Sequence, residues 1–185
     1  METDEEVYIR YRKEDNDADL ETLLVRHKDG LLLFLLGYVR CMEDAEEILM
    51  DTFARLAVNK PHFETRKKGS FRSWLYAIGR NNALMHIRKK KIQLVPLDES
   101  IPSANDLPDF TLLEQERNRK LYQALQKLKP EYRQALTLSF LEGLSHEEIA
   151  QAMGLRIRQI YNLMDRGKKS LKKELEEMGI TDAKY

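Results

Sequence analysis

The sequence is poor in the residues that form disulfides, metal sites and nucleotide-binding loops. Its 185 residues include one cysteine, four histidines and eight glycines. A single cysteine cannot close an internal disulfide, and the histidines are too far apart along the chain to form a local metal-ligand pair. The glycines form neither a phosphate-binding loop nor a dinucleotide fingerprint. We therefore expect no metal and no cofactor.

Long apolar stretches and catalytic motifs are also missing. The longest apolar run, residues 31–36, is far shorter than the roughly 20 residues needed to span a bilayer. The acidic N-terminus is followed by no apolar stretch of the kind found in secretory signals. No Ser, Cys or carboxylate lies in a recognisable catalytic motif. These absences predict a cytoplasmic protein without membrane insertion, and they argue against an enzyme.

Charge is plentiful but separated along the chain. The 31 basic and 31 acidic side chains give a formal charge of zero. Residues 1–64 carry 8 basic and 16 acidic side chains, whereas residues 65–91 carry 9 basic and no acidic ones. Residues 92–116 are acidic again (0 and 6), and residues 117–185 are basic (14 and 9). A block as basic as 65–91 in a neutral chain suggests a surface that binds a polyanion.

Apolar residues recur with helical spacing almost everywhere, which predicts an all-α fold. The expected helices are 20–24 and 31–39, separated or bent at Gly30, then 43–58, 71–91, 111–128, 131–141, 145–153 and 156–177. Residues 93–110 contain three prolines and no basic residue, and they have too few large apolar side chains for a core. The sequence thus predicts two small helical domains, 1–92 and 111–185, joined by a flexible acidic linker at 93–110.

The clearest local motif lies in the second domain. Ser145 and Glu148 have the spacing of a capping box, and Gly154 lies where a tight turn between two helices needs a left-handed residue. In the following helix Ile157, Ile160, Met164 and Leu171 share one face. Polar and basic side chains share the other: Arg156, Arg158, Gln159, Asn162, Arg166 and Lys169. This pattern is typical of a DNA-binding helix-turn-helix, although two ordinary amphipathic helices with a solvated charged face would also produce it.

A second motif combines aromatic rings with cations in residues 69–91. Single-stranded DNA is bound by such a combination, because bases stack on rings and phosphates pair with Arg or Lys. By composition alone the signal is weak, since Phe71, Trp74 and Tyr76 are each more often core residues than stacking platforms.

The order of the motifs is more specific than any one of them. The run Glu43-Asp-Ala-Glu-Glu-Ile-Leu-Met-Asp-Thr-Phe-Ala-Arg-Leu56 precedes Phe71-Arg-Ser-Trp-Leu-Tyr-Ala-Ile-Gly-Arg-Asn81. After the linker come Leu128-Lys-Pro-Glu-Tyr-Arg-Gln-Ala-Leu-Thr-Leu138 and the helix-turn-helix. This arrangement closely resembles the sigma-70 family, and within it the short extracytoplasmic-function group, which keeps only the second and fourth conserved regions.

The resemblance implies a bacterial transcription initiation factor without catalytic groups of its own. Its expected partners are core RNA polymerase, through the β′ clamp helices and the β flap, promoter DNA, and an anti-sigma factor. Residues implied to contact polymerase are Glu46, Glu47, Met50 and Asp51. Residues implied to open and hold the minus 10 element are Arg72, Trp74, Arg80, Asn81, Arg88 and Lys89. The helix 156–169 corresponds to the minus 35 reader. The alternative is a stand-alone helix-turn-helix regulator with a helical sensor domain.

Overall fold

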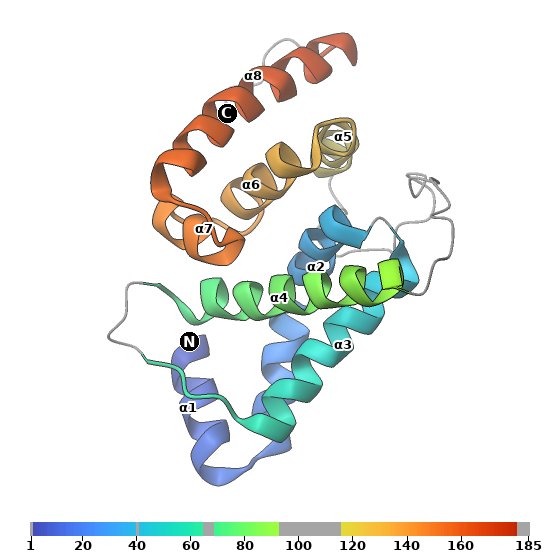
Figure 1. Ribbon diagram of the computed structural model, residues 1–185. Coiled ribbons are helices and arrows are strands. Elements are labelled where there is room, and N and C mark those ends of the chain that lie inside the picture. Colours follow the sequence, from blue (N-terminus) through green and yellow to red (C-terminus); the bar gives the residue numbers. More distant parts are fainter. Residues whose placement is uncertain (1, 40, 65–68, 93–115, 181–185) are drawn as a thin grey trace.

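The computed structural model describes residues 2–39, 41–64, 69–92 and 116–180, and within these ranges every regular element is a helix (Figure 1). The helices are α1 Asp4–Glu14, α2 Asp17–Val39, α3 Met42–Asn59, α4 Phe71–Ile92, α5 Glu116–Gln126, α6 Pro130–Phe140, α7 His146–Met153 and α8 Ile157–Glu177. The expected all-α fold is confirmed. The expected linker 93–110 and the start of the expected helix 111–128 lie outside the described residues.

Helix α1 is the element that apolar periodicity does not predict. Thr3 caps it, with the Thr3 hydroxyl accepting from the Glu6 N–H and the Glu6 carboxylate accepting from the Thr3 N–H. Its Tyr8 is fully buried, and the Tyr8 hydroxyl donates to the Pro61 carbonyl oxygen at 2.8 Å. The Glu5 carboxylate accepts from the Phe71 N–H at 2.7 Å. Helix α1 therefore caps the first turn of α4 with a carboxylate, where the helix dipole favours negative charge.

Helix α2 runs unbroken through Gly30, so this residue does not separate two helices, which was one of the two expected alternatives. A Cβ on Gly30 would collide with the Glu142 carboxylate and the Tyr76 hydroxyl. Gly30 is therefore needed for packing, because the absence of a side chain lets a residue from the C-terminal half reach between α2 and α4. The spacing of apolar residues along α2 cannot indicate such a contact.

Helices α3 and α4 pack side by side along their buried faces. The inner face of α3 consists of residues at helical spacing that are all buried: Ala45, Ile48, Leu49, Thr52, Phe53 and Leu56. Asn82 of α4 is also buried and donates from Nδ2 to the Thr52 hydroxyl at 2.9 Å. That hydrogen bond fixes the register between the two helices, since leaving either group unpaired in the core costs about 1–3 kcal/mol. Met85 of α4, in contrast, is 39% exposed.

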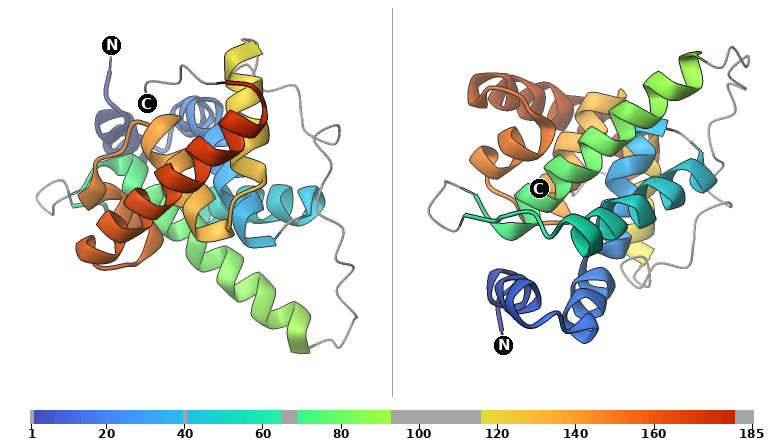
Figure 2. Two further views of the ribbon diagram at one scale, coloured as in Figure 1. Left: turned by 90° about the horizontal axis from the view of Figure 1, so that it is seen from above. Right: turned by 60° about the horizontal axis from the view of Figure 1, so that its bottom comes forward.

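The N-terminal and C-terminal helices share a single hydrophobic core among the described residues. Helix α7 packs along α4, and α6 packs against α2, as Figure 1 shows. In both views of Figure 2 the C-terminal end of α4 extends beyond the other helices. One end of α4 is therefore enclosed by the C-terminal half, and the other end is open to solvent.

Stability at acid pH depends on the Asp4 carboxylate, which lies 2.8 Å from both the buried His27 ring and the Arg26 guanidinium. Contact with His27 lowers the pKa of Asp4 to about 2, with Arg26 helping and burial opposing. Because the folded-state pKa is depressed, this stabilisation is present above the unfolded value and is lost as pH falls toward 2. We expect Asp4→Asn to lower the free energy of unfolding by about 1 kcal/mol at pH 7, after allowance for solvent screening.

Urea denaturation at pH 7 and at pH 2.5 measures this effect. The difference between wild type and Asp4→Asn should shrink at the lower pH, where the wild-type carboxylate also begins to take up a proton. Glu14→Gln removes one charge from the exposed end of α1 and is the matched control. If wild type and Asp4→Asn differed equally in free energy of unfolding at both pH values, the pH dependence would not come from the Asp4 carboxylate.

Candidate nucleic-acid interface

The helix-turn-helix is built as its motif predicts. The Ser145 hydroxyl accepts from the Glu148 N–H, and the Glu148 carboxylate accepts from the Ser145 N–H at 2.8 Å. Gly154 follows α7 with φ of 63°, in the left-handed region that favours glycine. These contacts satisfy backbone groups at both ends of the short α7, so the turn holds α8 at a fixed angle.

The outer face of α8 carries all six side chains expected to read DNA. Each is exposed: Arg156, Arg158, Gln159, Asn162, Arg166 and Lys169. Gln159 also accepts from the Arg156 N–H at 2.8 Å, so its amide closes the first turn of the helix. On the inner face Ile160 and Met164 are buried as expected, whereas Ile157 is 37% exposed. At the helix start, Ile157 therefore belongs to the outer surface.

Tyr161 is a member of this outer face that the sequence reasoning did not select. Its ring is 52% exposed and meets the His146 ring of α7 edge-on, with the ring centroids 4.8 Å apart. Helical spacing offers a signal for it, because Tyr161 lies three residues after Arg158 and next to Asn162. An exposed tyrosine among bases and phosphates can contact both, through its ring and its hydroxyl.

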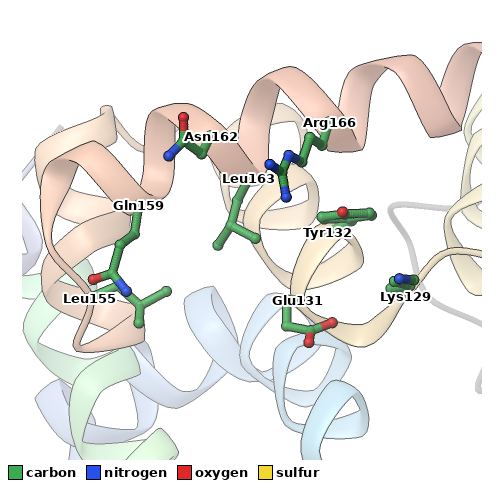
Figure 3. Close-up of a pocket in the computed structure, with 8 residues that line it drawn as sticks. All are labelled: Lys129, Glu131, Tyr132, Leu155, Gln159, Asn162, Leu163 and Arg166. Carbon is green, nitrogen blue, oxygen red and sulfur yellow. The ribbon is translucent and has the colours of Figure 1, made fainter.

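A groove of about 380 Å³ lies between α6 and α8 (Figure 3). Its lining residues are Lys129, Glu131, Tyr132, Leu155, Gln159, Asn162, Leu163 and Arg166. In Figure 3 the Arg166 side chain extends from α8 toward Tyr132. Three of the expected DNA readers thus line one groove together with Lys129, the N-cap residue of α6, which the sequence motifs did not indicate. Cations on both sides of a groove suit a phosphate backbone.

The expected strand-binding side chains on α4 fall into two groups. Asn81, Arg88 and Lys89 are exposed, and the last two belong to the last two turns of α4, whose C-terminal end extends beyond the other helices (Figure 2). Trp74 is half-buried, with its ring 5.3 Å from those of Tyr8 and Phe63. Trp74 therefore contributes to an aromatic cluster inside the N-terminal half, and only the exposed part of its side chain is available to a base.

Arg72 and Arg80 face the C-terminal half. The Arg72 guanidinium donates to the Glu142 carbonyl oxygen at 2.7 Å and lies 3.9 Å from the Glu142 carboxylate. The Arg80 guanidinium lies against Gly154, where any Cβ would collide with it. In this arrangement both cations contact the C-terminal half, and each side chain remains partly exposed.

The expected polymerase-binding face of α3 is open. Its members Glu46, Glu47, Met50 and Asp51 are all exposed, and Met50 is 58% exposed. An apolar side chain surrounded by carboxylates is a common composition for a protein–protein contact, where an apolar centre is ringed by polar groups.

Beside this face, charged groups from α3 and α4 form a cluster. The ligand atoms of Asp44, Glu47 and His86 are close enough together to hold a metal ion, a grouping that local sequence spacing does not reveal. However, the Lys90 ammonium lies 2.5 and 2.6 Å from the two carboxylate oxygens of Asp44, and this pairing raises the pKa of Lys90. We therefore interpret the cluster as an ion-pair network that joins the acidic helix to the basic helix.

Comparison with known proteins identifies both halves of the chain. Residues 23–92 match the family model described as Sigma-70 region 2, and residues 118–171 match the one described as Sigma-70, region 4. The RNA polymerase sigma factor CarQ of Myxococcus xanthus is 32% identical over 178 residues, which cover 95% of this chain and 99% of CarQ. The chain belongs to the sigma-70 family.

Other relatives indicate to which group within the sigma-70 family the chain belongs. The ECF RNA polymerase sigma factor SigW of Bacillus subtilis is 25% identical over 178 residues, covering 90% of this chain and 94% of SigW. The predicted extracytoplasmic-function type is thereby confirmed, and the function of this sigma factor is transcription initiation with RNA polymerase. Among the described helices, none is long and apolar enough to cross a membrane.

Two solved structures share the fold of this sigma factor. CnrH, solved in complex with the cytosolic domain of CnrY, has a TM-score of 0.63 at 19% identity, covering 92% of this chain and 96% of CnrH. The sigma factor RpoE of Bartonella quintana, solved with the anti-sigma factor NepR, has a TM-score of 0.63 at 21% identity, covering 85% of this chain and 97% of RpoE.

Proposed function

We propose that residues 1–92 of this sigma factor bind core polymerase and hold the minus 10 element, and that residues 111–185 bind the minus 35 element. Residues 93–110 connect the two parts. The observation that carries the proposal is the exposed acidic face of α3, with Met50 among its carboxylates. A regulator that binds an operator on its own has no use for such a face, whereas a protein that must dock on polymerase does.

The charge and exposure of each helix indicate which partner it contacts. The face of α3 contacts the β′ clamp helices, and α8 places its polar side chains in the major groove. Helix α4 supplies cations and aromatic edges that trap unpaired bases of the minus 10 element, offsetting part of the few kcal/mol needed to unstack each base. The polymerase carries out the chemistry, so this sigma factor needs no catalytic group and no cofactor.

We further propose a cytoplasmic location and two additional contacts, one with the β flap through region 4 and one with an anti-sigma factor. The anti-sigma proposal is supported by the structural neighbour RpoE, which was solved with NepR.

Reconstituted transcription tests the proposed function. Core polymerase of the source organism should produce no specific transcripts from genomic DNA by itself, and should produce a defined set when the full chain is added. A stand-alone regulator would bind DNA without core polymerase and would start no transcripts.

Side chains on α8 should differ in what they contribute to minus 35 binding. Asn162→Ala should change which minus 35 sequence is preferred, because an amide reads base edges. The lost discrimination should amount to about 1–3 kcal/mol per affected base pair. Arg166→Ala should weaken all sequences alike and reduce the salt slope by about one, because a phosphate contact carries no base identity. Sequencing of the DNA selected by each variant from a library with a randomised minus 35 element measures both effects.

Lys172→Ala, farther along the exposed side of α8, is the matched control and should alter neither property. If Asn162→Ala and Arg166→Ala both reduced the affinity for every sequence equally, the proposal that Asn162 reads bases and Arg166 contacts phosphate would be wrong.

A further inference from the structure

We propose that helix α1, which precedes the part of the chain matched by the region 2 family model, positions the side chains that hold the minus 10 strand. It fixes both ends of the connection between α3 and α4, and it packs against the ring of Trp74. The inference rests on the proposed function of α4 and adds residues outside α4 on which that function depends. Three sets of contacts carry it.

The first set of contacts holds the chain where it leaves α3 and runs across α1 (Figure 1). Arg12 donates from Nε to the Lys60 carbonyl oxygen at 2.9 Å and from Nη1 to His62 Nδ1 at 2.8 Å. The Tyr8 hydroxyl donates to the Pro61 carbonyl oxygen at 2.8 Å. Lys60 has φ of 40°, in the left-handed region that a residue with a side chain seldom adopts. Two side chains of α1 thus bind three consecutive residues and hold them in a conformation that the backbone alone disfavours.

The second contact holds the start of α4. The Glu5 carboxylate accepts a hydrogen bond from the Phe71 N–H at 2.7 Å. The N–H groups in the first turn of a helix have no partner within that helix, and a carboxylate binds them strongly. Glu5, Tyr8 and Arg12 are spaced three and four residues apart, so they share one face of α1. Because one helix face binds both ends of the connection, the two ends are held at a fixed separation.

The third set of contacts supports Trp74, the only aromatic side chain among those expected to hold the minus 10 strand. The centroid of the Tyr8 ring lies 5.3 Å from that of Trp74 and 5.0 Å from that of Phe71. The Phe63 ring, just after the residues bound by α1, also lies 5.3 Å from Trp74. Tyr8 and Phe63 are buried, whereas Trp74 is half-buried. The buried part of Trp74 therefore packs against rings that α1 supplies or holds in place.

A surface that is already ordered is an advantage for binding single-stranded DNA, because the unpaired strand itself is flexible. Each backbone residue that has to be ordered on binding weakens the affinity about tenfold. Contacts that order the protein in advance avoid this loss. Helix α1 therefore contributes to affinity and to base preference at the minus 10 element without contacting the DNA.

The double variant Tyr8→Phe and Arg12→Ala tests the proposal, because it removes the hydrogen bonds to residues 60–62 and keeps the aromatic ring. The probe is a fork DNA with a duplex minus 35 element and an unpaired non-template minus 10 strand, taken from a promoter that the wild-type holoenzyme transcribes. The variant holoenzyme should bind this fork about tenfold more weakly. Its preference among single-base changes in the unpaired strand should decrease by a similar factor.

Affinity for core polymerase and for a duplex minus 35 element should stay at the wild-type level, because α3 and α8 keep their exposed faces. Wild-type affinity and base preference on the fork in the folded double variant would overturn the proposal.

Arg10→Ala is the matched control. Arg10 lies on the same helix and pairs with Asp19 and Glu2, so this variant loses the same charge and its ion pairs but no contact with the connection. It should change the thermal midpoint without changing base preference. A loss of base preference in Arg10→Ala as large as in the double variant would show that α1 acts only through stability, and would overturn the proposal.

Two variants of Glu5 test the start of α4 separately. Glutamine keeps a side-chain oxygen that can accept from the Phe71 N–H, whereas alanine does not. Glu5→Gln should therefore retain most of the fork affinity, and Glu5→Ala should lose more of it. Fork binding by Glu5→Ala at the wild-type level would count against the proposal.

Fluorescence of Trp74 provides a measurement without polymerase, because Trp74 is the sole tryptophan of the chain. In the free double variant, acrylamide should quench Trp74 more strongly than in wild type or in Arg10→Ala, since the ring is held less firmly. Equal quenching in all three proteins would overturn the proposal. If the wild-type holoenzyme bound the fork with no base preference at all, the proposed function of α4 would be wrong, and this inference with it.

Discussion

Replacing Arg80, Asn81 and Arg88 together by alanine should nearly abolish opening of duplex promoters while leaving polymerase binding intact. These side chains lie on α4, whereas the acidic face lies on α3 and the minus 35 reader on α8. Losing three strand contacts of about 1 kcal/mol each predicts a decrease of about a hundredfold in open complexes. Permanganate footprinting of unpaired thymines measures the opening directly.

A template with a pre-melted bubble separates melting from strand holding. Because such a template removes the unstacking cost, transcription by the triple variant should recover in large part, and the remaining deficit should reflect the lost strand contacts.

The matched control is Lys172→Ala with Lys173→Ala, which removes two positive charges from the exposed far end of α8. This control should open promoters normally. Opening of intact promoters by the triple variant at the wild-type rate would show that this part of α4 is a solvated surface.

Reversing Glu47 and Asp51 to lysine should decrease the affinity for core polymerase by about a hundredfold or more. Placing like charges opposite each other across an interface costs several kcal/mol, whereas exposed substitutions on α3 should change folding stability by less than about 0.5 kcal/mol each. Native gel shift or fluorescence titration with labelled core polymerase measures the affinity. Far-UV circular dichroism and the thermal midpoint verify the fold.

Glu176→Lys with Glu177→Lys makes the same change in net charge on the exposed end of α8 and is the control. It separates a specific interface from a general effect of charge. If the folded variant with Glu47 and Asp51 both replaced by lysine bound core polymerase with wild-type affinity, the proposal that this face of α3 docks on polymerase would be wrong.

Features of this fold that depend on neighbouring residues could be predicted from the sequence. The capping box of Ser145 and Glu148, the left-handed Gly154 and the helix boundaries after residue 130 all follow from local backbone requirements, and each is present within a residue or two. Helix α1 has an equally local signal in Thr3 and Glu6, but its few apolar residues make a weak periodicity.

Features that depend on distant residues could not be predicted in this way. The role of Gly30 is set by Glu142, more than a hundred residues away. Arg72 and Arg88 look alike in the sequence, yet one is held by region 4 and the other is exposed. Helical spacing specifies which side of α4 a residue occupies, but which other helix covers that side is decided by tertiary packing.

The position of α1 limits how region 2 can be exchanged between sigma factors. The match to the region 2 family begins at residue 23, after α1 has ended. A chimaeric sigma factor joined at that point would lose the Glu5 carboxylate that caps α4, and it would expose aromatic rings that Tyr8 now covers. In such a chimaera α4 would begin with an unsatisfied N–H beside an uncovered apolar surface. A region 2 taken from this protein for a chimaera therefore has to include the first fourteen residues.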